Sequence, residues 1–324
     1  MRIGWRKLFS YLTRKPSRYH SIGIEFDANT LTIAVFQRLN GRPTWVQHYS
    51  IPTTDWQNAL AYFVVQNDLQ NTPTSVSFAI RSYQLLQVDR PAVPDEELGM
   101  AIQWSVQELL SSQDEMVVDY FDVPAQTTGA NKVNVVAIKK DDVHSVSKGI
   151  IEAGLMLKSI SVEELSYCDL VPWASGAALM LVQKAANMIS LNIVKDGKLY
   201  FNRSIRGFEK LRTFTEMELQ MGIVESLTVE VQRSMDFFES QLKQGAVRKI
   251  VMNLDSEHQQ VIGELISKAM LIDVEILSPP INKLPELDFS ESTWASLGAG
   301  LLLDNGATAN HLASDQNTNG EAAG

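Results

Sequence analysis

The residues best placed to do chemistry lie in a tight turn between two predicted strands. Residues 21–26 and 30–38 have the apolar character of strands, and the turn between them carries Asp27 and Asn29, with Glu25 just before it. A strand, tight turn and strand can hold nucleotide phosphates and a metal ion when glycine lets backbone N–H groups approach the phosphates. Here a carboxylate stands in the turn, and it repels a polyphosphate. The layout of a phosphate site is present without its glycine.

Other reactive side chains do not combine into a catalytic or metal site. The five histidines share no metal-ligand spacing, and neither a Gly-x-Ser-x-Gly nor a Walker motif occurs. The acidic pairs Glu96–Glu97 and Glu163–Glu164 fall on predicted helices, where neighbouring carboxylates usually form solvated faces. The single cysteine, Cys168, lies among helix-favouring apolar positions and is interpreted as a buried structural thiol. One cysteine also excludes an intramolecular disulfide and fits a reducing compartment.

Length and charge narrow the class of protein. A chain of 324 residues, 45% hydrophobic and 20% charged, can bury one large core or two lobes and is typical of soluble globular proteins. Six of its 28 basic residues lie in positions 1–18, so the remainder has 22 basic against 38 acidic residues, a charge of −16. An acidic body argues against nucleic acid as a partner. No apolar run of about 18 residues and no secretory signal occur, which predicts a cytoplasmic body.

The two faces of the N-terminal arm, residues 1–18, differ in character. Apolar side chains recur at helical spacing on one face, and basic ones lie on the other. The apolar face comprises Met1, Trp5, Leu8, Phe9 and Leu12, and the polar face comprises Arg2, Arg6, Lys7, Ser10 and Arg14. Such an arm suits an anionic membrane surface, where each basic residue adds about 1 kcal/mol of attraction. The alternatives are docking on the acidic body of the protein itself, and disorder.

Two stretches of the chain repeat one order of predicted elements. Each begins with a hairpin whose two-residue turn, Asn40–Gly41 or Asp196–Gly197, is the strongest short-range hairpin signal. Helical and strand patterns then alternate in both. The hairpin strands are predicted at 21–26, 30–38 and 43–50 in the first stretch, and at 188–194 and 199–203 in the second. This repetition indicates an internally duplicated fold of two α/β lobes, followed by a disordered tail over residues 304–324.

Several segments of the chain resemble a known family, the PilM-type pilus assembly proteins. They comprise a proline-led acidic helix that contains a tryptophan, an acidic strand after it, a return to the first lobe, and a second-lobe helix. In this sequence they are residues 88–98 and 101–104, 114–120, 153–155 with 162–163, and 227–238. The resemblance is spread over about residues 20–303. Within the family, the chain looks most like the branch that serves mannose-sensitive haemagglutinin (MSHA) pili.

The resemblance implies a fold and a partner. The fold would be a two-lobed actin-like (ribonuclease-H-type) α/β fold with a small inserted α/β subdomain. The expected divisions are a first lobe at 19–73 plus 159–180, the subdomain at 74–158, and a second lobe at 181–303. Such proteins are cytoplasmic subunits of an inner-membrane assembly platform, and they bind the cytosolic N-terminal tail of a PilN-like single-span protein. The cytoplasmic domains of GspL proteins of type II secretion form a related branch.

The chain departs from the family at the first phosphate motif. The family has Asp where this chain has Glu25, and Gly where it has Asp27. Glu25 still has the chemistry to reach a metal ion through water, because magnesium sites use few carboxylates and several waters. Asp27, however, replaces a backbone approach with a charged side chain.

Two further family motifs are also altered. Before the second hairpin, Gln183 takes the place of a carboxylate and Ala185 that of a glycine. The neighbouring Lys184 has the charge to pair with phosphate, although a single lysine in a mixed segment is usually solvated. Where the family has two glycines for adenosine, the chain has Leu254 and Asp255. Three losses together predict a degenerate nucleotide site with no cofactor and no hydrolysis.

These observations favour a non-catalytic adaptor. We expect it to hold the tail of a PilN-like protein in the cleft between the first lobe and the subdomain, and to transmit the motion of a separate pilus motor ATPase. The arm would keep it at the inner-membrane face. The alternative is an actin-like switch in pilus or type II secretion assembly that binds Mg-ATP through Glu25, Asn29 and Lys184. A filament-forming actin relative is a third hypothesis, and the proline-led acidic helix argues against it.

Overall fold

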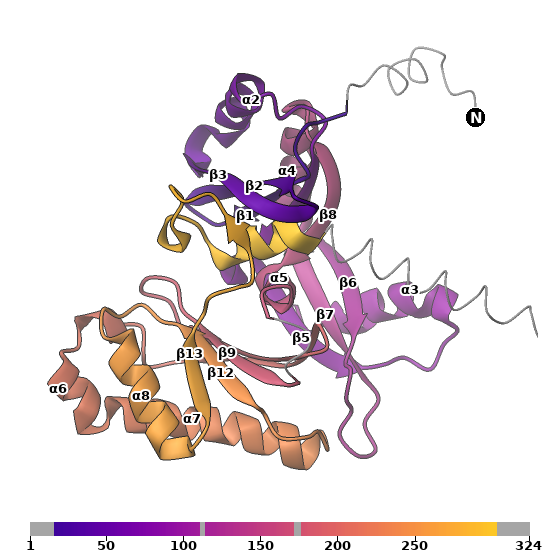
Figure 1. The fold of residues 1–324 in the computed structure, drawn as a ribbon. Coiled ribbons are helices and arrows are strands. Elements are labelled where there is room, and N and C mark those ends of the chain that lie inside the picture. The colour runs from indigo at the N-terminus through magenta and orange to yellow at the C-terminus, as the bar shows by residue number, and fades with distance from the viewer. Residues whose placement is uncertain (1–15, 111–113, 172–175, 303–324) are drawn as a thin grey trace, which may run out of the picture.

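Three β-sheets organise the protein in the computed structural model, which describes residues 16–110, 114–171 and 176–302. Figure 1 shows a sheet-centred lobe at the top, a second one at the bottom and a smaller sheet with its helix at the side. The arm residues Arg2, Trp5, Arg6, Lys7, Phe9 and Leu12, and the tail from residue 304 onward, lie outside the described residues.

The first sheet has six strands in the order β14-β3-β2-β1-β4-β8. Strands β1, β2 and β3 form an antiparallel meander, and β4 and β8 continue from β1 in parallel. The strands are β1 (Ser21–Phe26), β2 (Thr30–Leu39), β3 (Arg42–Pro52), β4 (Pro73–Phe78), β8 (Met156–Val162) and β14 (Asn282–Lys283).

The second sheet repeats this topology in the order β11-β10-β9-β12-β13. Again a three-stranded antiparallel meander is extended in parallel by two strands. The strands are β9 (Ala178–Val182), β10 (Ile189–Lys195), β11 (Lys198–Ile205), β12 (Lys249–Asn253) and β13 (Asp273–Ile276). The duplicated α/β architecture that the sequence predicts is confirmed.

Turn chemistry explains why the two meanders begin alike. Asn40 and Gly41 have φ angles of 50° and 78°, and Asp196 and Gly197 have φ angles of 52° and 69°. Two successive residues with positive φ form the turn whose twist matches that of paired strands, and Asn-Gly and Asp-Gly adopt it at low cost. Both predicted hairpins are therefore present.

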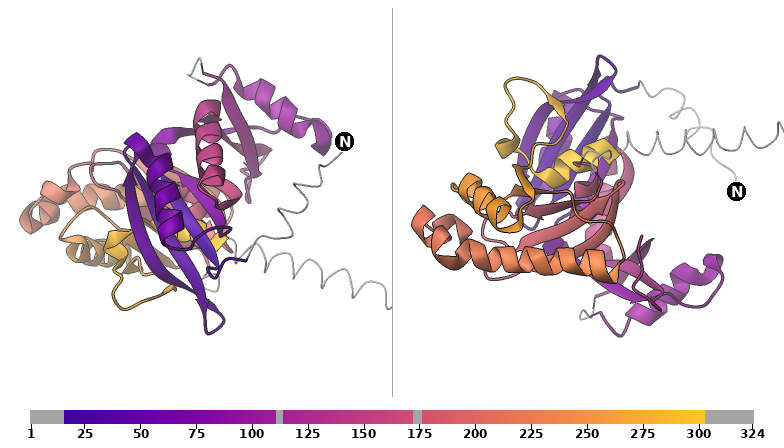
Figure 2. Two further views of the ribbon diagram at one scale, coloured as in Figure 1. Left: turned by 90° about the horizontal axis from the view of Figure 1, so that it is seen from above. Right: turned by 60° about the horizontal axis from the view of Figure 1, so that its bottom comes forward.

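A three-stranded sheet of order β5-β7-β6 forms the core of a small side unit. Its strands are β5 (Tyr83–Asp89), β6 (Met116–Asp122) and β7 (Lys132–Lys139), and helix α3 (Asp95–Val106) packs against one face. Because Pro91 and Pro94 prevent an earlier start, the sequence predicts a helix capped by Asp95. In the structure Pro94 occupies the N-cap position of α3, and Asp95 belongs to the first helical turn. Both views of Figure 2 show this unit projecting from the lobes.

Helices cover the outer face of each large sheet. The first sheet carries α2 (Trp56–Gln66) and α4 (Lys140–Glu152), and the second carries α7 (Val224–Asp236) and α8 (Gln259–Met270). The short elements are α6 (Glu216–Glu218), the 3₁₀ turns Thr53–Asp55, Ile80–Ser82, Leu211–Thr213 and Phe289–Glu291, and the π turns Leu219–Ile223 and Phe237–Gln241.

Between the two large sheets lie α5 (Glu163–Cys168) and a last helix, residues 294–302. The last helix approaches its neighbours backbone to backbone. An added Cβ on Gly298 would stand 1.9 Å from the carbonyl oxygen of Ser166, and one on Gly23 would stand 1.9 Å from that of Ser296. Only glycine fits at such contacts, which places the last helix directly on β1 and α5.

Candidate functional site

A cavity of about 640 Å³, here called the interlobe cavity, lies between the two large sheets. Residues of β1 and of the last helix line one side, and residues after β9 and β12 line the other. Of the seven residues predicted for a nucleotide site, six line it together: Glu25, Asp27, Gln183, Lys184, Leu254 and Asp255. Asn29 is not among the lining residues, and its carbonyl oxygen accepts a bond of 3.1 Å from the Thr53 N–H.

Lys184 forms the electrostatic centre of this region. Its Nζ contacts Glu25 Oε1 and lies 2.8 Å from Glu163 Oε2. The expectation that Lys184 is solvated is wrong, because only 23% of its side chain is exposed and two carboxylates hold it. Glu25 lies on β1 of the first sheet, and Lys184 follows β9 of the second sheet. This ion-pair triad therefore connects the two lobes.

Helix α5 holds two buried carboxylates side by side in sequence. Glu163 is 3% exposed and Glu164 is 1% exposed, so the expectation that this acidic pair forms a solvated face is also wrong. Glu163 Oε2 accepts a bond of 3.2 Å from the Ile80 N–H in addition to Lys184. Glu164 Oε2 accepts a hydrogen bond from the Tyr83 hydroxyl of β5. Through these two residues, α5 is joined to both lobes and to the three-stranded sheet. Figure 1 shows α5 between the lobes.

Burial perturbs the ionisation of these groups. Burial raises the pKa of Glu25, and the Lys184 ammonium acts against it. Burial raises the pKa of Glu164 to about 7, and the charge of Glu163 adds to this rise. Burial disfavours the charged form of Lys184, but the two carboxylates more than offset it, so its pKa is raised. Burial also raises the pKa of the Cys168 thiol, as expected of a structural cysteine.

The turn after β1 uses its own side chain to satisfy its backbone. Asp27 Oδ1 accepts a bond of 2.6 Å from the Ala28 N–H, and the Asp27 N–H donates to the Thr30 carbonyl at 3.0 Å. A phosphate cradle needs such N–H groups to point at the ligand. In this protein the carboxylate of Asp27 already takes the N–H of the following residue.

Gln183 ties together the segments at the second-lobe side of the cavity. Its Nε2 donates to the carbonyl oxygens of Asn187 at 2.9 Å and Phe208 at 2.8 Å, and its Oε1 accepts from the Asp255 N–H at 3.2 Å. Asp255 Oδ2 in turn accepts from the Ala186 N–H at 3.2 Å. The Leu254 side chain, 4% exposed, packs into the core beneath α7 and α8. These side chains are engaged in holding loops.

The lining of the interlobe cavity has an excess of negative charge. It includes four carboxylates, those of Glu25, Asp27, Asp255 and Asp288, against the single ammonium of Lys184. A nucleoside triphosphate is itself a polyanion, and like charges at close range repel. Within residues 16–110, 114–171 and 176–302, no group of three or more His, Cys, Asp or Glu side chains is arranged to hold a metal ion. The four carboxylates of the lining oppose a polyphosphate, and its one ammonium is already paired with Glu25 and Glu163.

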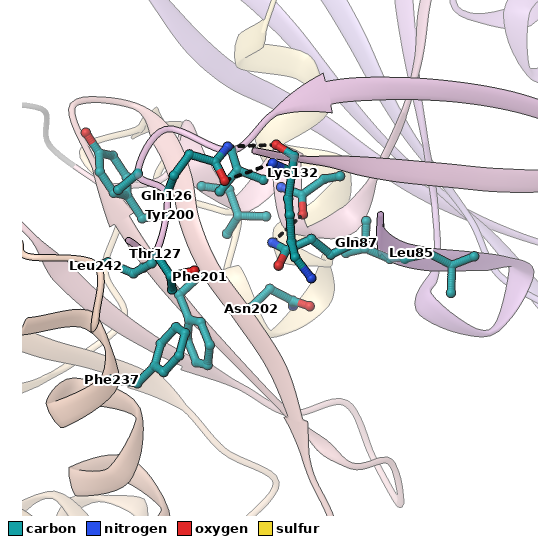
Figure 3. A pocket seen from close by; sticks show the side chains of 15 residues that line it. Leu85, Gln87, Gln126, Thr127, Lys132, Tyr200, Phe201, Asn202, Phe237 and Leu242 are labelled. Atoms are coloured by element: carbon teal, nitrogen blue, oxygen red, sulfur yellow. Dashed lines mark hydrogen bonds between the residues drawn. The ribbon is translucent and has the colours of Figure 1, made fainter. Parts of the chain in front are cut away.

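A second cavity, of about 210 Å³ and here called the edge cavity, lies between the three-stranded sheet and the second sheet. Figure 3 shows Gln87 and Lys132 on one side and Phe201 and Asn202 on the other. The Phe201 and Phe237 rings stand 5.1 Å apart between centroids. The Gln126 amide closes the β6–β7 loop by bonding the Lys132 carbonyl at 2.7 Å and the Lys132 N–H at 3.0 Å.

Sequence reasoning missed the parts of the site that depend on tertiary contacts. Glu163 is 21 residues from Lys184, and Tyr83 is 81 residues from Glu164. The one available signal was Lys184 itself, since a lysine directly after a buried strand needs a partner if it is to remain charged there. No sequence pattern indicated the edge cavity, because its lining residues come from elements far apart in the chain.

Comparison with known proteins identifies the fold. No protein-family model and no curated protein sequence matches this chain. Its structure is similar to that of the PilM–PilN type IV pilus biogenesis complex, with a TM-score of 0.61, 18% identity, and coverage of 88% of this chain and 98% of that one. The fold is actin-like. The two-lobed architecture expected from the sequence is thereby confirmed.

Two further solved structures are less similar. One is the cytoplasmic domain of EpsL, an inner-membrane component of the type II secretion system of Vibrio cholerae, with TM-score 0.48, 9% identity, and coverage of 86% of this chain and 94% of that one. The other is a Bacteroides thetaiotaomicron protein with an actin-like ATPase fold and unknown function, with TM-score 0.48, 11% identity, and coverage of 87% and 96%. Among the described helices, none is long and apolar enough to span a membrane.

Proposed function

We propose that this protein is a non-catalytic adaptor in a type IV pilus assembly platform, and that among PilM-type proteins it most resembles MshI of the MSHA pilus. The similarity of its fold to that of the PilM–PilN complex supports the class of assembly. The proline-led acidic helix and the acidic strand after it correspond to α3 and β6 of the structure. They support assignment to the pilus branch of these proteins.

One observation carries the non-catalytic part of this proposal. The Lys184 ammonium pairs with Glu25 and Glu163 at the point where an actin-like site would need room for a metal ion and phosphates. A buried cation paired in this way neutralises the carboxylates that would otherwise attract a divalent metal. The adaptor would thus hold its lobes together with a side chain in place of a nucleotide.

The partner in this proposal is the cytosolic tail of a PilN-like inner-membrane protein. We place the tail in the cleft between the first lobe and the three-stranded unit, with the basic arm of residues 1–18 on the inner face of the membrane. In this arrangement the protein is cytoplasmic and peripheral, and it transmits the motion of a separate motor ATPase. Nucleic acid is not a partner, because the body of the protein carries strong negative charge.

Co-purification tests the adaptor function. The PilN-like protein is expressed with and without its N-terminal tail, and its recovery on the tagged adaptor is compared. Recovery should depend on the tail, and equal recovery of both forms would refute the proposed contact. The same adaptor, residues 1–324 with the N-terminal arm, is used with both forms of the PilN-like protein, so that the contact of the arm with the membrane is the same.

The second candidate is an ATP-binding switch in pilus or secretion assembly. Its support is the size of the interlobe cavity, about 640 Å³, which lies within the roughly 300–1,000 Å³ range of small-ligand sites. Calorimetry with Mg-ATP separates the two candidates. The adaptor proposal expects no binding in the low micromolar range, and binding at that level would favour the switch.

A further inference from the structure

A groove of about 540 Å³, here called the α3 groove, lies between helix α3 and strand β6, the outer strand of the three-stranded sheet (Figure 1). From β6 it is lined by the alternate residues Met116 and Val118. The lining residues of α3 have the i, i+3, i+4, i+7 spacing of one helical stripe: Met100, Gln103, Trp104 and Gln107. Met100 is 64% exposed and Trp104 is 75% exposed. Apolar surface rimmed by polar residues is typical of an interaction site.

The segment that forms the α3 groove is acidic throughout. Residues 91–131 supply the whole lining, and they contain eight acidic residues and no lysine, arginine or histidine. Four of the eight pair with Arg90, Lys139 or Lys140, which lie outside this segment: Asp95, Asp114, Glu115 and Asp122. The other four are exposed and form no ion pair among the described residues: Glu96, Glu97, Glu108 and Asp119. The segment therefore stays negative after its ion pairs are set aside.

The N-terminal arm has the opposite charge and a matching apolar stripe. Its residues 1–15 carry five basic side chains and no acidic one. Met1, Trp5 and Leu8 recur at i, i+4 and i+7, which is also the spacing along α3, and Phe9 adjoins them. A helix that lays such side chains into an apolar groove is a common mode of peptide recognition. The charge and the spacing of the arm therefore both suit the α3 groove.

Helix α4 connects the place where the arm leaves the body to the α3 groove. Ser17 Oγ, at the end of the arm, lies 2.6 Å from Thr72 Oγ1. The N–H of the residue before Thr72 donates, at 2.8 Å, to the carbonyl two residues beyond the C-terminal end of α4. At the other end of α4, the Lys140 N–H donates at 2.8 Å to the carbonyl of Glu115, which lines the groove.

The arm is long enough to cover this distance. The 13 residues of α4 span about 20 Å. The seven residue steps from position 9 to position 16 span up to about 24 Å when extended. Residues 1–9, which hold the apolar stripe, can therefore reach the α3 groove of their own chain.

We propose that residues 1–9 of the arm dock in the α3 groove of the same chain, in competition with the membrane surface. The groove and the membrane would bury the same apolar side chains, so the arm occupies one of them at a time. Docking keeps the arm from the membrane until an anionic surface outcompetes the groove. The docking itself is independent of the PilN-like partner, whereas the competition rests on the proposed place of the arm at the inner-membrane face.

Other occupants are opposed by the charge of the groove. A second copy placed groove to groove would bring the four exposed carboxylates of each chain together, and like charges repel. An anionic lipid surface and nucleic acid are repelled for the same reason. The tail over 304–324 has three acidic residues and no lysine or arginine, so it lacks the charge of the arm.

Hydrogen exchange of the full chain without membranes measures the docking. Trp104→Gln removes the largest side chain of the groove, and Tyr62→Gln on α2, where the ring is 68% exposed, is its matched control. Glu108→Lys reverses a charge beside the groove, and Glu225→Lys does so at an exposed site on α7. Amides of residues 1–9 should exchange about tenfold faster in Trp104→Gln and in Glu108→Lys than in the wild type, tenfold being the effect of one good contact. Both controls should stay within about twofold.

Binding to anionic vesicles is the second measurement. A docked arm lowers the apparent affinity for a membrane in proportion to the fraction of free arm, so tenfold protection corresponds to about tenfold weaker vesicle binding. Trp104→Gln should therefore bind vesicles of phosphatidylserine and phosphatidylcholine about tenfold more tightly than the wild type, and Tyr62→Gln should change this binding by less than about twofold.

Three results would overturn the docking. They are unprotected residues 1–9 in the wild type, equal effects of Trp104→Gln and Tyr62→Gln on exchange, and protection that increases with protein concentration, since the arm would then dock on another copy. Slower exchange that Trp104→Gln removes, together with no vesicle binding by any variant, would support the docking and refute the membrane role of the arm.

Discussion

Replacement of Lys184 by methionine removes the positive charge that connects the lobes while it keeps most of the side-chain volume. Glu25 and Glu163 would remain, 2% and 3% exposed, with their ammonium partner gone. Breaking one side of a buried ion pair costs more than the pair contributes, because the remaining charge is buried without compensation. The Lys184→Met variant is therefore a direct test of the triad.

The size of the effect follows from the burial of the three groups. Loss of one partner of a buried ion pair typically costs about 3–5 kcal/mol. Since 23% of the Lys184 side chain is exposed and water can partly replace it, we expect the lower end, about 3 kcal/mol at pH 7.5. For comparison, Lys158→Met on β8 removes an exposed lysine and should change stability by less than about 0.5 kcal/mol.

The loss should depend on pH in a defined direction. Without the ammonium, which acts against burial at Glu25, the pKa of that carboxyl rises further above its ordinary value. A folded state with a raised carboxyl pKa binds protons that the unfolded chain has released, so its stability increases as the pH falls toward the ordinary pKa. Each unit of pKa difference corresponds to about 1.4 kcal/mol. The deficit of Lys184→Met should shrink between pH 7.5 and pH 5.

Urea unfolding of the wild type and the variant at both pH values measures these quantities. The triple variant Glu25→Gln, Lys184→Met, Glu163→Gln removes all three charges of the triad and should recover most of the loss at pH 7.5, because no charge of the triad is left without its partner. A deficit below about 1 kcal/mol at pH 7.5, or one that is the same at pH 5, would refute the reasoning.

Three further predictions concern other parts of the molecule. Glu164, with its pKa raised by burial to about 7 from 4.5, is more stable protonated, so it should lower stability by about 3 kcal/mol as the pH rises from 4.5 to above 7. Glu164→Gln should remove this contribution and make the pH slope in urea unfolding shallower, and an unchanged slope would contradict the assignment. Gly298→Ala should destabilise by about 1–3 kcal/mol through its contact with the Ser166 carbonyl, whereas Gly99→Ala in α3, with open space around it, should stabilise by about 0.5–1 kcal/mol; thermal unfolding that ranks them otherwise would disprove the packing. Replacement of the arm residues Trp5, Phe9 and Leu12 by glutamate should weaken membrane association in fractionation and leave the circular dichroism spectrum unchanged. Unchanged association would exclude the anchor role of the arm.

Local chemistry is the part of the fold that sequence alone predicts well. The Asn40–Gly41 and Asp196–Gly197 turns are fixed by residues that tolerate positive φ, and each hairpin follows from its turn. The repeat of hairpin and α/β units gives the duplication, because both lobes use the same order of elements. The start of α3 was predicted within one residue, but the predicted cap, Asp95, is wrong because the helix begins one residue earlier, with Pro94 at the N-cap position.

The candidate site could be predicted only in part. The sequence indicated which residues would approach the interlobe cavity, and six of seven line it. It failed for Lys184 and for Glu163–Glu164, because a six-residue helix between two sheets is buried on all sides and shows no exposed face for charged residues. Whether a charged residue is solvated depends on what the fold places over it, and those partners lie from 21 to 159 residues away.

The last helix also determines the order in which the two lobes can finish folding during synthesis. Residues 294–302 pack on β1 and α5, and β14 pairs with β3, so the first lobe incorporates segments made after the second lobe has been translated. On the ribosome, the second lobe has all its strands available before the first lobe does, although the first lobe begins at the N-terminus. A nascent chain stalled before residue 282 would expose the surface around Gly23, and chaperones should bind the first lobe there until translation ends.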